Sequence, residues 1–505
     1  MTPNRRQVLA GAAASAAVLA TARRNGALAA LSDESYATMS AGEAIGEIRA
    51  GRTSVSEYVE SLLARSDRLS HLNAFITQDK AVIRAAAAAV DAKLAAGQDA
   101  GALSGVPFCA KDNIDSADMR TTGGTPGLAD WRPSANAPIL QSLLDQNGVL
   151  IGKANMHELA FGITNNNAGF GAVGNPFNPT MIPGGSSGGT GAAVAAGLAP
   201  VGLGSDTGGS VRIPASASGV VGYKAPFGRN PLDRDHPLES LLHYGPMTRC
   251  VGDAALMQNV MSGAHPEDMC SLREDMVIPE RPGGIKGWKV ALSMDLGFFE
   301  VAPEVREKTL AAAEAFRALG CEVEEVALDW SYDIHDPYLQ YWEGMAATTL
   351  AQYLPEWRDR MDPYMAGIIE HGAGHTAATQ YQCNLVRGQM YQALAPIFER
   401  YDVMICPALS VPSVKAEHDL ADPNFEINGE PTEAYLGWNM CYPFNMVSQC
   451  PVMCVPNGFC PETGVPIGLQ IVGRTFDDLS VFRAATAFEA VRSPLYDKHG
   501  ARPEL

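Results

Sequence analysis

The sequence predicts an α/β fold in which helices cover a mixed or parallel β-sheet. Two strand-like runs, GWKVALS at 287–293 and CEVEEVALD at 321–329, flank a helix-like run at 305–320. Residues 142–156 show the same alternation, as helix, turn and strand. Strands that alternate with helices are typical of a sheet with covering helices.

The chain before this alternation is predicted to be helical. Residues 39–69 are interpreted as helices, because Ser54 and Glu57 form a capping-box pattern next to periodic apolar residues. Residues 82–97, VIRAAAAAVDAKLAAG, form a strong helix by propensity.

Composition indicates a chain that can bury a substantial hydrophobic core, and it disfavours nucleic acids and anionic membranes as partners. The 505 residues are 46% hydrophobic and 18% charged, and no internal apolar run approaches the roughly 20 residues of a membrane span. The net charge is −19. Because contacts to phosphates need clustered Lys and Arg, we expect no nucleic-acid partner and no attraction to anionic membranes.

The first 29 residues predict an export signal. Arg5 and Arg6 precede an apolar stretch at 8–20, and Ala27-Leu28-Ala29 is a small-residue cleavage site. This arrangement is typical of a twin-arginine signal, so the mature chain is expected at 30–505 in the periplasm or outside the cell, with no membrane insertion after export.

Two Gly/Ser clusters lie between residues 181 and 226 and predict the reactive centre. The first, at 184–189, precedes small residues suited to a tightly packed helix, so its serines are expected at a helix N-terminus. The second is Asp206-Thr207-Gly208-Gly209-Ser210. Ser210 is placed as a nucleophile, and the N–H groups of Thr207, Gly208, Gly209 and Ser210 are expected to form an oxyanion hole.

A serine nucleophile needs a base, and no histidine lies near either cluster in the sequence. Lys111 follows the apolar run VPFCA, where desolvation would lower its pKa and let it accept a proton. Lys153 and Lys224 are rival candidates for this role. The residues alone leave the choice open.

The motifs together resemble the amidase signature family. They are GVPFCAKDNID at 105–115, the segment 183–216, GYKAPFGR, GPMTR, PFNMVSQCPVMCVPNGF and GVPIGLQIVGR. The resemblance implies one large domain with a central mixed sheet covered by helices on both faces. It also implies a triad of Lys111, Ser186 in a cis peptide, and Ser210 as nucleophile. Asp206, Arg212 and Ser187 match supporting positions.

Substrate choice is expected where the chain departs from these motifs. The segment 330–392 is rich in Tyr, Trp and Met, which form adaptable apolar pocket walls, although each of these residues can also simply pack helices. By their positions relative to the family motifs, Asn166, Trp438 and Cys441 are candidate substrate contacts. No basic or acidic cluster marks a charged substrate, so a small neutral amide, anilide or carbamate is expected.

Several alternatives remain open at this stage. Ser187 also fits the nucleophile elbow of an α/β-hydrolase, with His418 or His499 as its partner, although the preceding segment is a poor strand. Also open are a serine esterase on the same site, a homodimer and an amidotransferase A-like subunit. No cofactor is expected, and no metal site, because Cys450 and Cys454 lack a second ligand pair. Few disulfides are expected among the ten cysteines.

Overall fold

The computed structural model describes residues 31–233, 238–274, 276–492, 503 and 505. The predicted export signal at 1–29 and His499 lie outside these residues. The strands are β1 (Phe75–Thr77), β2 (Pro107–Lys111), β3 (Val149–Ala154), β4 (Val201–Asp206), β5 (Val221–Lys224), β6 (His243–Thr248), β7 (Lys289–Leu292), β8 (Glu322–Glu325), β9 (Val403–Pro407), β10 (Glu426–Ile427), β11 (Glu430–Pro431), β12 (Val452–Phe459) and β13 (Pro466–Gly473).

One mixed sheet organises the described chain. Its eleven strands run in the order β1-β3-β2-β4-β6-β5-β12-β13-β9-β7-β8, while β10 and β11 form a separate hairpin. The pairs β2·β3, β2·β4, β7·β8 and β7·β9 are parallel and the other neighbours are antiparallel. Strands from both ends of the chain therefore belong to one α/β core, as the sequence predicted.

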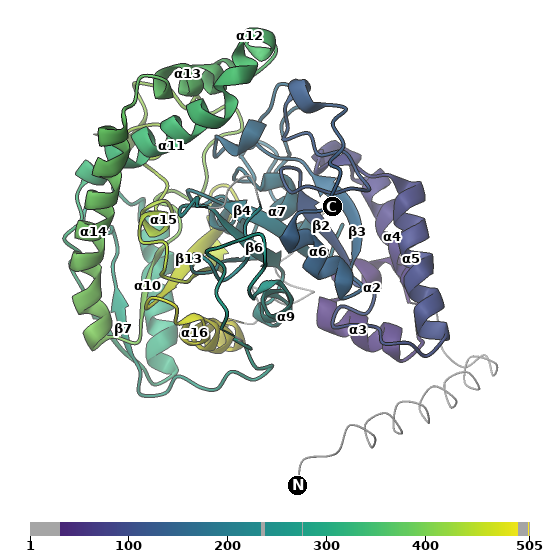
Figure 1. The fold of residues 1–505 in the computed structure, drawn as a ribbon. Coiled ribbons are helices and arrows are strands. Elements are labelled where there is room, and N and C mark those ends of the chain that lie inside the picture. Colours follow the sequence, from purple (N-terminus) through teal and green to yellow (C-terminus); the bar gives the residue numbers. More distant parts are fainter. Residues whose placement is uncertain (1–30, 234–237, 275, 493–502, 504) are drawn as a thin grey trace.

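Helices flank this sheet on both faces (Figure 1). They are α2 (Asp33–Thr38), α3 (Ala41–Arg49), α4 (Val55–Arg68), α5 (Lys80–Ala95), α6 (Pro138–Asp145), α7 (Gly188–Ala195), α8 (Arg212–Ala217), α9 (Val251–Met261), α10 (Pro303–Ala318), α11 (His335–Leu350), α12 (Leu354–Trp357), α13 (Pro363–Gly372), α14 (Ala377–Arg400), α15 (Pro443–Met446) and α16 (Asp478–Val491). Of these, α7 and α8 pack on the central strands and on each other, as do α9 and α16.

The helices predicted from sequence form with identifiable caps. The Ser54 hydroxyl accepts from the Glu57 N–H, and the Glu57 carboxylate accepts from the Ser54 N–H, which completes the capping box at the start of α4. The predicted helical region 39–69 is divided into α3 and α4 by a turn at 50–54.

The variable segment at 330–392 folds mainly as α11, α12, α13 and the start of α14. Helix α11 packs against α13 and α14 at one end of the molecule (Figure 1). All ten cysteines, which fall in the described residues, are free. Within those residues, no helix combines the length and apolar character needed to span a bilayer.

The parallel strands β2 and β4 decide where the reactive residues meet. They are neighbours in register, with Phe108 opposite Val201 and Ala110 opposite Leu203. Since the carboxyl ends of parallel strands lie at the same sheet edge, Lys111 at the end of β2 and the loop after Asp206 at the end of β4 come together.

Candidate active site

Lys111 lies at the centre of a buried polar cluster. Its Nζ is 2.6 Å from the Ser186 Oγ and 2.8 Å from the Ser205 Oγ. The side chain is fully buried. Burial lowers the pKa of Lys111 to about 7, and the negative charge of Asp206 opposes this shift only in part. Near neutral pH the amine is therefore available as a proton acceptor for a serine hydroxyl.

Ser186 belongs to the first Gly/Ser cluster and is held next to the second. Its peptide bond to Gly185 is cis. The Ser186 carbonyl accepts from the His157 N–H at 3.2 Å, and the next residue, Ser187, donates its N–H to the carbonyl of Ser210 at 3.2 Å. Ser187 is also the first residue before α7, as expected for a turn at a helix N-terminus. This backbone contact brings Ser186 beside the Ser210 loop.

The small residues of the first cluster allow close packing behind this turn. All residues of α7 are buried. A Cβ on Gly189 would lie 2.6 Å from the carbonyl oxygen of Ala74, so a larger residue would push the helix away from the site.

The loop from Thr207 to Ser210 presents its N–H groups because its carbonyls are anchored elsewhere. The Thr207 carbonyl accepts from the Tyr338 hydroxyl at 3.4 Å, and the Gly208 carbonyl accepts from the Asn439 amide at 2.8 Å. Within the described residues, no group accepts from the N–H of Thr207, Gly208 or Ser210. Backbone N–H groups without an internal acceptor are available to stabilise an oxyanion.

Gly209 departs from the four-donor oxyanion hole expected from sequence. Its N–H donates to Oδ1 of Asp206 at 2.8 Å. The φ angle of Gly209 is +106°, a region that favours glycine, and this conformation turns its N–H toward the carboxylate. The loop thus offers the N–H groups of Thr207, Gly208 and Ser210, while Gly209 fixes the turn.

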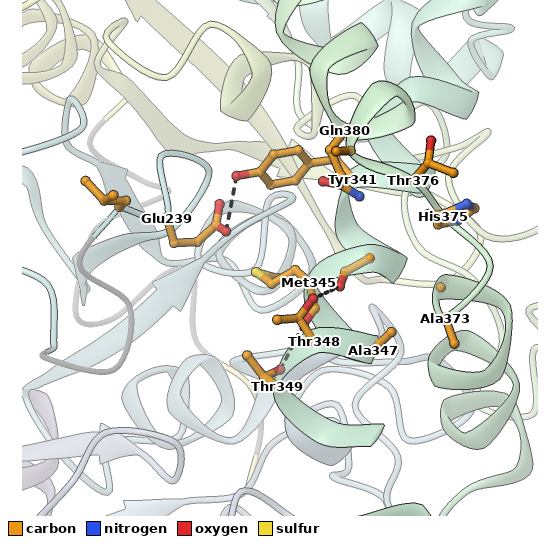
Figure 2. Close-up of a pocket in the computed structure, with 14 residues that line it drawn as sticks. Glu239, Tyr341, Met345, Ala347, Thr348, Thr349, Ala373, His375, Thr376 and Gln380 are labelled. Atoms are coloured by element: carbon orange, nitrogen blue, oxygen red, sulfur yellow. Dashed lines mark hydrogen bonds between the residues drawn. The ribbon is translucent and has the colours of Figure 1, made fainter. Parts of the chain in front are cut away.

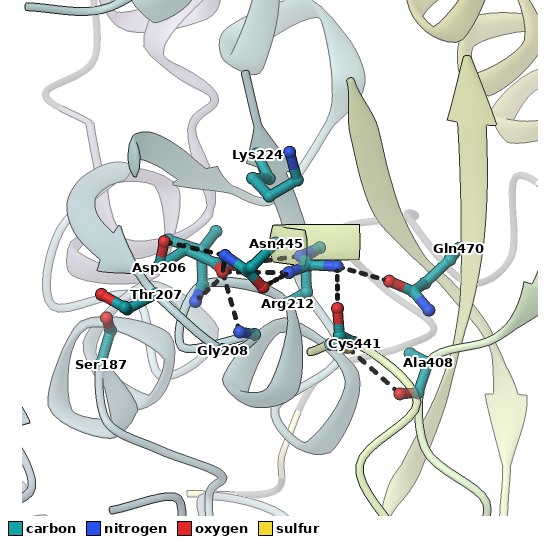
Figure 3. A network of polar contacts seen from close by, with 12 residues as sticks. Ser187, Asp206, Thr207, Gly208, Arg212, Lys224, Ala408, Cys441, Asn445 and Gln470 are labelled. Atoms are coloured by element: carbon teal, nitrogen blue, oxygen red, sulfur yellow. Dashed lines mark hydrogen bonds and ion pairs between the residues drawn. The ribbon is translucent and has the colours of Figure 1, made fainter. Parts of the chain in front are cut away.

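A buried ion pair between Asp206 and Arg212 lies next to this loop (Figure 3). Arg212 Nε lies 2.9 Å from Oδ2 of Asp206, and neither side chain is exposed. Burial alone would raise the pKa of Asp206, but the charge and hydrogen bonds of Arg212 lower it below its ordinary value. Arg212 also donates to the Gln470 side chain at 2.8 Å and to the Asn445 side chain at 2.7 Å. With further bonds to the Cys441 carbonyl at 2.9 Å and to Oδ1 of Asp206 at 3.0 Å, all five donors are satisfied, as a buried charge requires.

The rival lysines have other partners. Lys153 Nζ is 2.6 Å from the Thr121 hydroxyl and 3.3 Å from Oδ1 of Asp112. Lys224 donates to the carbonyl of Cys450 at 2.8 Å and, as Figure 3 shows, extends away from the Arg212 network. Burial followed by the charge of Arg212 lowers the pKa of Lys224 to about 7. Of the three lysines, only Lys111 contacts Ser186.

The nucleophile-elbow alternative lacks its structural context. Residues 175–180, ahead of the first cluster, contain no strand. The Ser187 hydroxyl donates to the Ser205 carbonyl at 3.2 Å, and His418 Nε2 is 2.8 Å from the Ala434 carbonyl. A Ser187–His418 pair is therefore not formed in this structure.

Two of the three expected substrate contacts are buried side chains. Trp438 is fully buried and its indole N–H donates to Ala434 at 2.9 Å. Cys441 is also buried, with Sγ 3.1 Å from the Ala408 carbonyl. A Cβ on Gly209 would lie 2.5 Å from the Cys441 Cβ, so Cys441 packs directly against that loop. Both side chains are buried in this structure, and their contact with a substrate stays a prediction. Asn166 is exposed and donates its N–H to His157 Nδ1 at 3.3 Å.

Several residues at the site were not found by sequence reasoning. The Ser205 hydroxyl accepts hydrogen bonds from the Lys111 Nζ at 2.8 Å and from the Asn113 amide at 3.1 Å. The Asn445 amide donates to Asp206 Oδ1 at 2.9 Å. Ser205 and Asn445 stand inside recognised motifs, whereas Tyr338 stands in the variable segment. His157 is distant in sequence from both clusters. Burial, and after it the positive charge of Lys111, lowers the pKa of His157 to about 3.

Comparisons with known proteins bear on the fold and on the family resemblance of the chain. The amidase family model matches residues 57–482. The A subunit of the glutamyl-tRNA(Gln) amidotransferase of Geobacillus thermodenitrificans is 33% identical over 480 residues, which are 90% of this chain and 96% of the relative. An acylamidase of Rhodococcus erythropolis is also 33% identical, covering 93% and 99% of the two chains. The crystal structure of a bacterial aryl acylamidase of the amidase signature family superposes with a TM-score of 0.86 at 30% identity, covering 92% of this chain and 99% of that one.

Proposed function

Because the chain belongs to the amidase signature family, whose members hydrolyse amide C–N bonds, we propose that it cleaves small amides through an acyl-enzyme on Ser210. The observation that carries this proposal is the 2.6 Å contact between the Lys111 Nζ and the Ser186 Oγ. It joins a buried amine with a lowered pKa to Ser186. Ser186 lies beside the loop from Asp206 to Ser210, which we call the nucleophile loop.

The first half of the reaction forms the acyl-enzyme. The Ser210 hydroxyl loses its proton to Ser186 as Ser186 passes its own proton to Lys111, and Ser210 Oγ bonds the carbonyl carbon. The negative oxygen that results is stabilised by the free loop N–H groups. When the C–N bond breaks, Ser186 returns a proton to the leaving nitrogen and is reprotonated by Lys111.

The second half releases the acid. Water attacks the ester on Ser210 and gives its proton through Ser186 to Lys111, which again forms a tetrahedral oxyanion at the same N–H groups. The C–O bond to Ser210 then breaks, and the proton returns to the Ser210 oxygen. The enzyme is restored without any net proton uptake by these three residues.

The substrate is a small amide, anilide or carbamate that is neutral at the bond cleaved. The similarity to proteins called acylamidase and aryl acylamidase supports this class. A serine esterase remains the second candidate, because the same acyl-enzyme forms from an ester. The predicted twin-arginine signal at 1–29 supports export, and disfavours a role like that of the similar amidotransferase protein.

The activity is tested with the mature chain on an aliphatic amide, an anilide, a carbamate and a p-nitrophenyl ester. Amide turnover should vanish in Lys111→Ala and in Ser210→Ala. Full activity of Lys111→Ala would place the base elsewhere. Turnover of the ester alone by the unmodified chain would favour the esterase.

Export is tested separately by fractionating cells that express the full chain. The protein should reach the periplasm or medium, and replacing Arg5 and Arg6 by Lys should retain it in the cytoplasm. A protein found only in the cytoplasm, in a complex with other proteins, would instead support the amidotransferase role.

A further inference from the structure

A pocket of about 650 Å³ opens between α11, the start of α14 and the segment before β6 (Figure 2). One wall is the segment leading into β6, with Glu239, and the opposite wall is α11, with Tyr341 and Met345. His375 and Gln380, near the start of α14, close a third side. We call this the Glu239 pocket.

Two hydrogen-bonded connections place the Glu239 pocket next to the reactive centre. On α11, Tyr338 donates to the Thr207 carbonyl at 3.4 Å, less than one helical turn before the pocket residue Tyr341. On the other wall, the Leu241 carbonyl accepts from the Asn445 amide at 3.1 Å, and Asn445 itself contacts the nucleophile loop at Asp206. Each wall of the pocket is therefore close in sequence to a residue, Tyr338 or Leu241, that is hydrogen-bonded to the nucleophile loop or to Asn445 beside it.

Glu239 is the pocket's carboxylate, and it lacks a cationic partner. Its Oε1 accepts from the Leu241 N–H at 3.0 Å and its Oε2 accepts from the Tyr341 hydroxyl at 3.3 Å. No Lys, Arg or His in the described part of the chain forms an ion pair with it. A carboxylate has about four acceptor sites, so two hydrogen bonds leave it capacity for a ligand.

The electrostatic surroundings of Glu239 combine burial with one nearby positive charge. Burial raises its pKa, opposed by the Leu241 N–H, the Tyr341 hydroxyl and the charge of Arg387. That guanidinium donates to Ser240 at 2.7 Å and to the Met446 carbonyl at 2.8 Å, not to Glu239. A positive group bound in the pocket would therefore compensate a charge that the protein leaves without an ion pair.

The other polar groups of the pocket are occupied within the protein. Thr348 donates to the Gly344 carbonyl at 2.8 Å, and the Gln380 amide donates to the Gln340 carbonyl at 2.8 Å. His375 Nε2 lies 2.7 Å from the Glu343 carboxylate. Glu239 is the carboxylate among the residues that line the pocket, and it keeps acceptor capacity for a ligand.

We propose that the Glu239 pocket binds a protonated amine carried by the substrate, so that the preferred substrates are amides with an ammonium group remote from the bond cleaved. This inference rests on the proposed function. It departs from the expectation of a neutral substrate, because the remote end of the substrate carries a positive charge although the reacting bond is neutral. The sequence showed no acidic cluster because a single Glu in the pocket is sufficient.

The test compares two anilides of equal chain length, whose acyl chains end in an ammonium or in a methyl group. The unmodified chain should show at least about a tenfold higher kcat/KM for the ammonium substrate, since hydrogen bonds to charged groups are strong. Glu239→Gln should bring the ratio of the two kcat/KM values close to one. Using this ratio cancels any general loss of activity caused by the substitution.

A matched variant and a binding measurement separate the possible outcomes. Glu343→Gln also removes a nearby carboxylate, but one already paired with His375, so it should keep the ammonium preference. Calorimetry of n-butylammonium binding to Ser210→Ala should show binding that is lost when Glu239→Gln is added. This inference alone would be overturned if anilide turnover depended on Ser210 but showed no preference for the ammonium substrate. It would also be overturned if butylammonium bound equally well with and without the Glu239 carboxylate. Absence of turnover on every amide would overturn the proposed function.

Discussion

The Tyr338 hydroxyl lies in the space that a Cβ on Gly208 would occupy, and it donates to the carbonyl of Thr207 at 3.4 Å. A side chain from the variable helix α11 thus fixes the backbone of the nucleophile loop from outside the shared motifs. The identity of residue 208 and the position of α11 are coupled through this contact.

This coupling predicts the effect of adding a methyl group to the loop. Gly208→Ala should lower kcat by at least about tenfold, because the new Cβ displaces either Tyr338 or the N–H donors. In a Tyr338→Phe background the same change should cost less, since the nearest remaining atom of that ring, Cζ, is 3.1 Å from the Cβ position. The double-mutant cycle in kcat measures the coupling, and equal effects in both backgrounds would argue against it.

The buried pair of Asp206 and Arg212 predicts a large loss of stability. Asp206→Asn should lower the free energy of unfolding by about 3–5 kcal/mol, because it leaves the Arg212 guanidinium buried without its counter-ion. Adding Arg212→Met should recover part of this loss. Urea denaturation followed by circular dichroism would detect the effect, and strictly additive losses would contradict a direct interaction.

Catalysis should depend on pH through Lys111. Because its pKa is lowered to about 7, the neutral base predominates above that pH. Therefore kcat/KM should rise as the pH increases through about 7 and fall as Lys111 becomes protonated below it. Lys111→Arg should be inactive across this range, since its guanidinium stays charged.

Lys224 provides the control for this assignment, because its pKa is also lowered to about 7. Its hydrogen bonds go to the carbonyls of Ser448 and Cys450. Lys224→Met should keep the rising limb of the pH profile in place. A shift of that limb in this variant would mean that Lys224, not Lys111, governs it.

The relay assigned to Ser186 predicts a difference between substrates. Ser186→Ala should reduce amide hydrolysis by a larger factor than hydrolysis of a p-nitrophenyl ester, whose leaving group departs without a proton. The measurement is the ratio of the two kcat/KM values. Ser218→Ala removes another buried hydroxyl, one that donates to the Pro183 carbonyl at 3.0 Å, and should leave that ratio unchanged. Equal losses on amide and ester would remove the relay role from Ser186.

Much of the fold could be read from local patterns. The capping box at Ser54 and the helix after the first Gly/Ser cluster are encoded by adjacent residues, so the sequence predicted both. The alternating elements around 287–329 became β7, α10 and β8 for the same reason. Contacts across long sequence separations were not accessible in this way. The strand order that puts β2 beside β4 is a property of the whole sheet.

By itself, the sequence determined the candidate reactive groups, because glycine-rich turns, serine hydroxyls and a lysine in an apolar run are local features. Only the tertiary structure decided which lysine meets Ser186, which loop N–H groups remain free, and that Trp438 and Cys441 are buried. These outcomes depend on burial and on hydrogen bonds between distant segments. Both exist only once the sheet has brought those segments together.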